Sequence, residues 1–223
     1  MTVRDGNGRR RLRAAPLPVL TGLVASAILG LGATGTLSAF TASITNSSNT
    51  AATGSLVMKE TDSSGSTICL SSSGTNNSNT SCGTIDKYGG TGTGLTPGGT
   101  PNITTIRMYN TGTSAVNAFQ LAPGTCTKSG SGTGDLCGQL QLTLTCAPVT
   151  GGTAGTAVTL YNAVALNALT TKDIKAASAT CVPPTSSSDY TRFVFTVQLS
   201  SGADNTVQAQ TVSQPLVWTY TGA

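Results

Sequence analysis

Three segments of the chain alternate strictly between apolar and polar residues, which predicts β-strands with one buried and one solvated face. These segments are Gln139–Cys146, Arg192–Leu199 and Leu216–Tyr220. Less regular strands are predicted at Ser55–Thr61, Asn102–Tyr109, Ala115–Leu121 and Val158–Leu160. Leu160–Leu169 is the one helical candidate, and it is short.

The connecting segments, such as Ser71–Thr80 and Gly89–Gly94, are polar and rich in glycine, as turns between strands are. No repeat of 20 to 50 residues is visible, so a solenoid or propeller is not expected. Antiparallel strands with one solvated face favour a sandwich. The sequence therefore predicts an all-β fold, a single jelly-roll-like antiparallel β-sandwich over residues 55–223 with at most one or two short helices.

The first 38 residues have the layout of a secretory signal. Five arginines lie between positions 4 and 13, and residues 16–36 carry no charge. Small residues follow, which suits signal peptidase cleavage between Ser38 and Ala39. We therefore interpret residues 1–38 as a signal peptide.

Two alternatives for this segment stay open. About 20 apolar residues are enough for an uncleaved membrane anchor, although Pro16, Pro18 and several glycines weaken such a helix. The pair Arg9–Arg10 also fits a twin-arginine signal, but such pairs are common in ordinary basic leader segments.

Cleavage changes the charge of the protein. The whole chain carries twelve basic and eight acidic residues, but five of the basic ones and one acidic one precede Ala39. The remaining chain is formally neutral, with seven of each. No basic patch with interleaved aromatic residues is left in the sequence, so we do not expect nucleic acid as a partner.

Six cysteines in an exported chain favour three disulfides over a metal site. None of them forms a C-x-x-C pair, the tight spacing typical of structural zinc sites. Fifteen connectivities are possible. Local closure favours Cys69–Cys82 and Cys126–Cys137, which leaves Cys146–Cys181.

The sequence offers no catalytic residue, metal ligand set or cofactor motif. The chain contains no histidine, which excludes Ser-His-Asp and Cys-His catalysis and every histidine-containing metal motif. No serine lies in a G-x-S-x-G elbow. Glu60 and Asp62 form the closest carboxylate pair and would share a strand face, where a weak cation site or, more simply, a solvated strand end is expected. We therefore predict that the protein is not an enzyme.

Several motifs follow one another in a characteristic order. Residues 36–60 read TLSAFTASITNSSNTAATGSLVMKE, a Thr-x-Ser-Ala-Phe junction followed by a polar spacer and a strand. Leu95–Gly98, a strand, the Asn110–Gly112 hairpin and a second strand come next. Val158–Leu169 and the aromatic strand Leu216–Gly222 complete the series.

In these features the chain resembles the TasA/camelysin family of secreted proteins, which is exported through a SipW-type signal peptidase. The likeness covers the signal and about half of the mature chain. Gly99 replaces the family's usual Asp, and the low charge and six cysteines are also departures. The resemblance implies a jelly-roll-like sandwich that polymerises into extracellular fibres of a biofilm matrix.

The resemblance also implies that the mature N-terminus is a donor strand for the neighbouring subunit. Phe40, Ala42 and Ile44 alternate with polar residues and would give this strand one apolar edge. A flexible tether, Asn46–Gly54, follows, so residues 39–54 form a donor strand and tether ahead of the sandwich. The predicted donor strand comprises Ala39, Phe40, Thr41, Ala42, Ser43 and Ile44.

The expected partner is a second copy of the chain, joined head-to-tail, together with signal peptidase during export and an accessory or anchoring fibre subunit. The expected location is the extracellular matrix or cell surface of a Gram-positive bacterium, without stable membrane association after cleavage. One alternative is a monomeric surface or adhesive module with residues 39–45 paired in cis. A metallopeptidase, described among family members, is the other, but the chain lacks the histidines of H-E-x-x-H.

Overall fold

The computed structural model describes residues 50–80, 82, 85–92 and 94–222. The predicted signal peptide, the cleavage site Ser38/Ala39 and the donor strand Ala39–Ile44 lie outside these residues. Residues 52–223 form one compact unit by their contacts.

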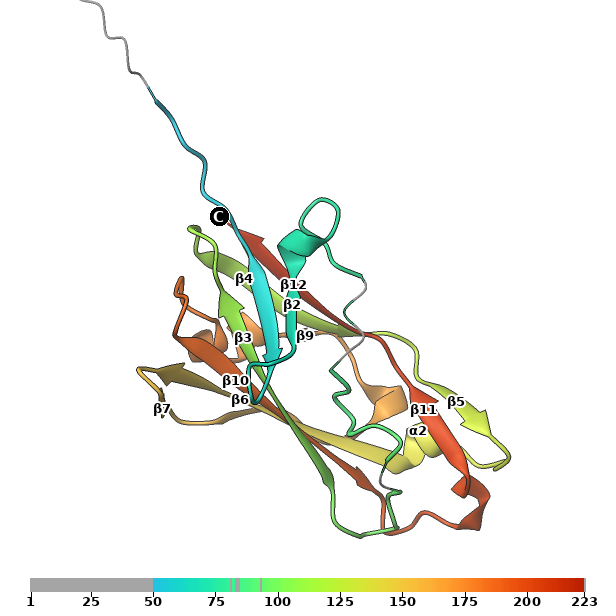
Figure 1. Cartoon of the computed structure of the whole chain (residues 1–223). Helices are drawn as coiled ribbons and strands as arrows, with labels where there is room; N and C mark the ends of the chain where they lie inside the picture. The colour runs from blue at the N-terminus through green and yellow to red at the C-terminus, as the bar shows by residue number, and fades with distance from the viewer. Residues whose placement is uncertain (1–49, 81, 83–84, 93, 223) are drawn as a thin grey trace, which may run out of the picture. The chain divides into compact units, whose positions relative to one another are not determined.

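The larger sheet is antiparallel and is built around the strongly alternating segments of the sequence. Its strands follow the order β2-β1-β3-β10-β6-β7, and β8 also pairs with β6 (Figure 1). Residues on alternate positions of β6 and β10 are buried, as period-two patterning requires. The strands are β1 Met58–Asp62, β2 Ile68–Leu70, β3 Asn102–Asn110, β6 Leu140–Thr150, β7 Thr153–Ala154, β8 Val158–Ala165 and β10 Tyr190–Leu199.

The second sheet has the order β12-β4-β9, and a separate two-stranded ribbon pairs β11 with β5. Gly124 and Pro215 lie where the chain passes between the sheet and the ribbon, and the Gly124 N–H donates to the Pro215 carbonyl at 2.8 Å. The strands are β4 Val116–Pro123, β5 Thr127–Gly130, β9 Lys172–Asp173, β11 Gln210–Ser213 and β12 Leu216–Gly222.

Aromatic rings join the two sheets in the core. Phe119 on β4 lies edge-on to Phe193 on β10, with ring centroids 5.8 Å apart, and both side chains are fully buried. Trp218 on β12 also contacts Phe193, at 4.9 Å. With few aromatic residues in the chain, this cluster supplies much of the large apolar surface that the sandwich buries.

The prediction of an all-β antiparallel sandwich is confirmed. The described residues contain two short α-helices, α2 Leu136–Gln139 and α3 Ile174–Ala177. Their N-caps are Asp135 and Asp173, which accept hydrogen bonds from backbone N–H groups of the first turn. The 3₁₀ turns are η1 Ser71–Ser73, η2 Leu166–Ala168, η3 Ala179–Cys181 and η4 Asn205–Val207.

The helix predicted at Leu160–Leu169 is wrong, because this segment contains the last six residues of β8 followed by the turn η2. The register of β8 against β6 shifts twice, and Ala163 has a positive φ of 50°. These irregularities interrupt the alternation of apolar residues. The apolar pairs Leu160/Val164 and Leu166/Leu169 consequently fall at the i, i+4 and i, i+3 spacings that are typical of a helix.

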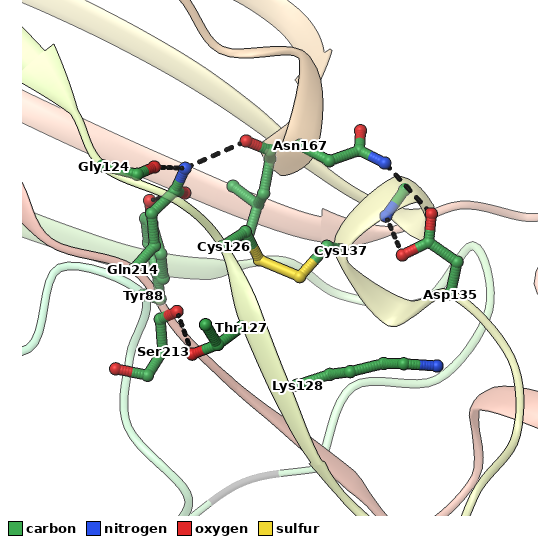
Figure 2. Close-up of a disulfide and its surroundings, with 12 residues drawn as sticks. Tyr88, Gly124, Cys126, Thr127, Lys128, Asp135, Cys137, Asn167, Ser213 and Gln214 are labelled. Atoms are coloured by element: carbon green, nitrogen blue, oxygen red, sulfur yellow. Dashed lines mark hydrogen bonds between the residues drawn. A yellow bond between two sulfur atoms is a disulfide. The ribbon is translucent and has the colours of Figure 1, made fainter.

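The structure contains the three disulfides expected from local closure: Cys69–Cys82, Cys126–Cys137 and Cys146–Cys181. Cys146 and Cys181 are fully buried and tie β6 to η3. Cys126–Cys137 joins the segment before β5 to α2, as Figure 2 shows. Cys69–Cys82 anchors the long loop that follows β2.

Candidate functional site

β12 is an edge strand whose outer side is left uncovered. It pairs with β4 over the register Leu216↔Pro123 to Gly222↔Val116, and the described residues provide no partner strand on its other side. Natural proteins usually protect such an edge with charged residues, proline or a bulge. The sequence of β12, LVWTYTG, contains no charge and no proline, and its register shift against β4, between Thr221 and Gly222, lies at the very end of the strand. Its free backbone groups are therefore available to pair with another strand.

A groove of about 720 Å³ runs along this edge. On one side lies β12, and on the other lie β1 with the segment before it and the segment Ile85–Tyr88. Leu216, Trp218 and Tyr220 point toward the core but are only half-buried. The groove thus exposes apolar surface next to unpaired backbone.

Two side-chain donors in β12 have no acceptor. The indole Nε1 of Trp218 and the hydroxyl of Tyr220 are buried atoms without a hydrogen-bond partner among the described residues. Burial, and secondly the negative charge of Glu60, raise the pKa of Tyr220 well above its ordinary value of 10. The Tyr220 hydroxyl therefore stays protonated. Buried donors without acceptors are uncommon, and each one costs stability until something accepts from it.

An ion pair lies among the residues that line the groove. Lys87 Nζ lies 2.6 Å from Glu60 Oε1, and both side chains are about nine-tenths buried. The expectation of a solvated Glu60 is therefore wrong. Because Glu60 on β1 is paired with Lys87, it does not form a cation site with Asp62.

Asp62 is engaged in a local turn. Its carboxylate accepts hydrogen bonds from the hydroxyls of Ser64 and Ser66 and from the backbone N–H groups of Ser66 and Thr67, at 2.8–3.3 Å. Desolvation raises the pKa of Asp62, but these hydrogen bonds outweigh it and lower the pKa to about 2. Asp62 thus stabilises the β1–β2 connection.

A hydrogen-bond network fixes the start of β12. The Tyr88 hydroxyl donates to Gln214 Oε1 at 2.7 Å, and Gln214 Nε2 donates to the carbonyls of Gly124 and Leu166. Figure 2 shows Tyr88, Gln214 and Gly124 together beside the Cys126–Cys137 disulfide. The segment Ile85–Tyr88 is thereby bound to both sides of the groove, at Gln214 and, through Lys87, at β1.

The residues of the groove bring together no catalytic set. Across the described parts of the chain, no group of three or more Cys, Asp or Glu is arranged to hold a metal ion. Within the same residues, no helix has the length and apolar character needed to cross a membrane. The chemistry that this site offers is strand pairing and apolar contact.

The sequence predicted the strand Leu216–Tyr220 but did not identify the groove. The alternation of Leu216–Tyr220 shows which side chains point inward, but it does not show that β12 lies at an edge. The absence of any charge or proline in this strand was the one feature of the sequence that could have indicated an unprotected edge. The predicted donor residues Ala39–Ile44 lie outside the described chain, so the structure does not place them.

No protein-family model matches the chain, and no curated protein sequence matches it significantly.

Proposed function

We propose that this protein is a secreted structural subunit that polymerises head-to-tail into extracellular fibres. Each subunit donates its mature N-terminal strand, residues 39–45, to the β12 edge of the next subunit. The uncovered edge of β12, beside a groove with an apolar wall, is the observation that carries this proposal. The resemblance to the TasA/camelysin family supports the same function.

The pattern of the donor strand complements the two faces of β12. A strand added to an edge gains main-chain hydrogen bonds, and alternate side chains supply specificity. Phe40, Ala42 and Ile44 would point into the groove beside the half-buried face of β12. The hydroxyl residues Thr41, Ser43 and Thr45 would lie on the solvent side, next to the exposed Val217, Thr219 and Thr221.

The start of the sandwich is anchored, which gives the tether a defined origin. The Ser55 carbonyl accepts from the N–H groups of Thr113 and Ser114 at 2.7 and 2.8 Å, and its own N–H donates to Thr113 Oγ1 at 2.9 Å. The tether Asn46–Gly54 therefore leaves from the β3–β4 hairpin. Nine extended residues span at most about 30 Å. This length permits residues 39–45 to reach a neighbouring subunit.

Head-to-tail donation generates an open filament because each subunit gives one strand and receives one. Signal peptidase would create the donor by cutting after Ser38. The three disulfides fit an oxidising compartment. An accessory subunit with a similar strand could start or anchor the filament, and the family resemblance favours the surface or matrix of a Gram-positive bacterium.

The experiment compares purified mature protein with a variant lacking residues 39–45, using negative-stain electron microscopy and sedimentation velocity. We expect the mature protein to form fibres and the truncated protein to remain a folded monomer. Phe40→Asp should abolish fibres, whereas the matched control Thr41→Asp, on the opposite face of the strand, should retain most assembly. Normal fibres from the truncated protein would refute strand donation. A mature protein that stays monomeric would favour the binding module with residues 39–45 in cis.

A further inference from the structure

The outward face of the larger sheet gathers cations and tyrosines from three strands that are far apart in the sequence. We define this cationic face as Lys59 on β1, Arg107 and Tyr109 on β3, and Tyr190 and Arg192 on β10. Strand register places Lys59 opposite Tyr109 and Arg107 opposite Arg192. The sequence showed no basic patch with interleaved aromatic residues, yet the sheet assembles a small one.

The cations of this face lie on tyrosine rings. Lys59 Nζ is 4.7 Å from the ring centroid of Tyr109, and Arg107 Cζ is 5.2 Å from that of Tyr190. The two tyrosine rings are themselves 5.1 Å apart. Such contacts hold cationic side chains in place without neutralising their charge.

Arg107 and Arg192 form an unfavourable pair unless an anion joins them. Like charges directly opposite each other on neighbouring strands destabilise a sheet. Arg107 donates to the Ser63 carbonyl, but Arg192 Nε is buried without a hydrogen-bond partner in the described chain. A buried unpartnered guanidinium N–H in a native protein calls for an acceptor, such as an ion or water.

The carboxylates at the end of β1 and just before β10 form no ion pair with these arginines in the described chain. Asp62 accepts its hydrogen bonds from Ser64, Ser66 and Thr67, and Asp189 accepts from the Gly151 N–H at 3.0 Å. In the described residues, the ion pair that forms is Lys87–Glu60. The positive charge of the cationic face is therefore left for an external partner.

We propose that the cationic face binds the phosphate groups of an anionic polymer. Guanidinium forks bind phosphate bidentately, and a tetrahedral anion can accept from two arginines on different sides. Neighbouring strands are about 4.8 Å apart and residues rise about 3.4 Å along a strand, so the Cα atoms of Lys59 and Arg192, two strands and two residues apart, are about 12 Å apart. This separation lets the two side chains contact different phosphates of one extended polymer. Because both tyrosine rings lie against cations, we expect no added affinity from base stacking.

This inference does not rest on strand donation. The cationic face is on the larger sheet, whereas the open edge of β12 belongs to the second sheet. The face of a monomer would also bind the polymer. A fibre would present the face many times, and such multivalency would increase its avidity for a long polymer.

The test titrates the mature protein with fluorescently labelled long-chain inorganic polyphosphate and follows anisotropy at several salt concentrations. We expect log K to fall with log salt with a slope of about −2 to −3, for two or three phosphate contacts. Arg192→Gln should weaken binding roughly tenfold, as expected for a lost charged hydrogen bond, and should reduce the slope by about 1. Lys59→Gln, the second variant, removes a cation from β1 and should also weaken binding.

Lys175→Gln is the matched control, because Lys175 lies on α3 and donates to Asn117 Oδ1 on β4. It removes the same charge but should change affinity less than twofold. If Lys175→Gln and Arg192→Gln lower the affinity for polyphosphate equally, with folding confirmed by circular dichroism, the proposed site is wrong. A mature protein that does not bind polyphosphate at all would also overturn it. Polyglutamate that binds as tightly would overturn the phosphate assignment. Oligothymidylate that binds more tightly than polyphosphate would overturn recognition through phosphate alone.

Discussion

Replacing Phe119 with alanine tests whether the aromatic cluster supports both the sandwich and the groove. Phe119 is completely buried. Its ring lies 5.8 Å from Phe193, 5.5 Å from Trp218 and 4.7 Å from Tyr220, measured between centroids. The substitution therefore removes a ring that two inward side chains of β12 pack against.

The expected loss follows from burial and ring contacts. A buried Phe→Ala substitution costs about 3–5 kcal/mol of unfolding free energy. Aromatic pairs contribute about 0.5–1.5 kcal/mol beyond area burial. We therefore expect Phe119→Ala to lower the unfolding free energy by about 4–5 kcal/mol, near the upper end of the range for buried Phe→Ala substitutions. For a domain of this size, 1 kcal/mol lowers Tm by about 2–4 °C, so the expected decrease is about 8–20 °C.

The assay is urea unfolding of the chain beginning at Asn46, so that fibre assembly does not contribute. Fluorescence of Trp218, the single tryptophan of the chain, reports the cluster directly. Val217→Ala is the control, since Val217 is the next residue to Trp218 but is 55% exposed. It should change stability by no more than about 0.5 kcal/mol. A loss below about 2 kcal/mol for Phe119→Ala, or an equal loss for Val217→Ala, would refute the reasoning.

Three further predictions concern acid stability, a disulfide and the open edge. Asp62 has a pKa lowered to about 2, so its stabilising effect is complete above its ordinary value of 3.8 and disappears as pH falls toward 2; an NMR titration midpoint near 3.8 would contradict this. Replacing Cys146 and Cys181 together with alanine opens a loop of 35 residues and should cost about 4 kcal/mol by chain entropy. A decrease in unfolding free energy of less than about 1 kcal/mol, measured by calorimetry, would contradict this stabilising role of the disulfide. Val217→Lys should slow fibre growth several-fold, because lysine on an edge strand discourages the addition of another strand. The control Ile103→Lys, at a similarly exposed position of the other sheet, should not slow it. Equal growth rates for the two variants, measured by light scattering, would argue against the β12 edge as the site of strand addition.

The sequence predicted strands best where one face of the strand is buried and the other is exposed to solvent. Alternation located β6, β10 and β12, because period two directly records the two faces of a strand. It failed in β8, where register shifts and the positive φ of Ala163 broke the pattern. It also missed β2, β5, β7, β9 and β11, which have two to four residues each and are too short for alternation to identify.

The candidate site was harder to predict, because it depends on which strands become neighbours. The sequence predicted a solvated Glu60, whereas in the structure the loop after β2 places Lys87 beside it. Arg107 and Arg192 are separated by about half of the sandwich sequence, yet they lie directly opposite each other in the sheet. Long-range pairing of this kind leaves no local signal in the sequence.

The most direct test of strand donation is a structure of the assembled fibre that traces residues 39–45. We predict that this segment lies hydrogen-bonded along β12 of the adjacent subunit, with Phe40 facing the groove lined by Trp218 and Tyr220. A fibre in which the segment pairs with its own subunit, or in which the edge of β12 remains uncovered, would contradict the proposed function.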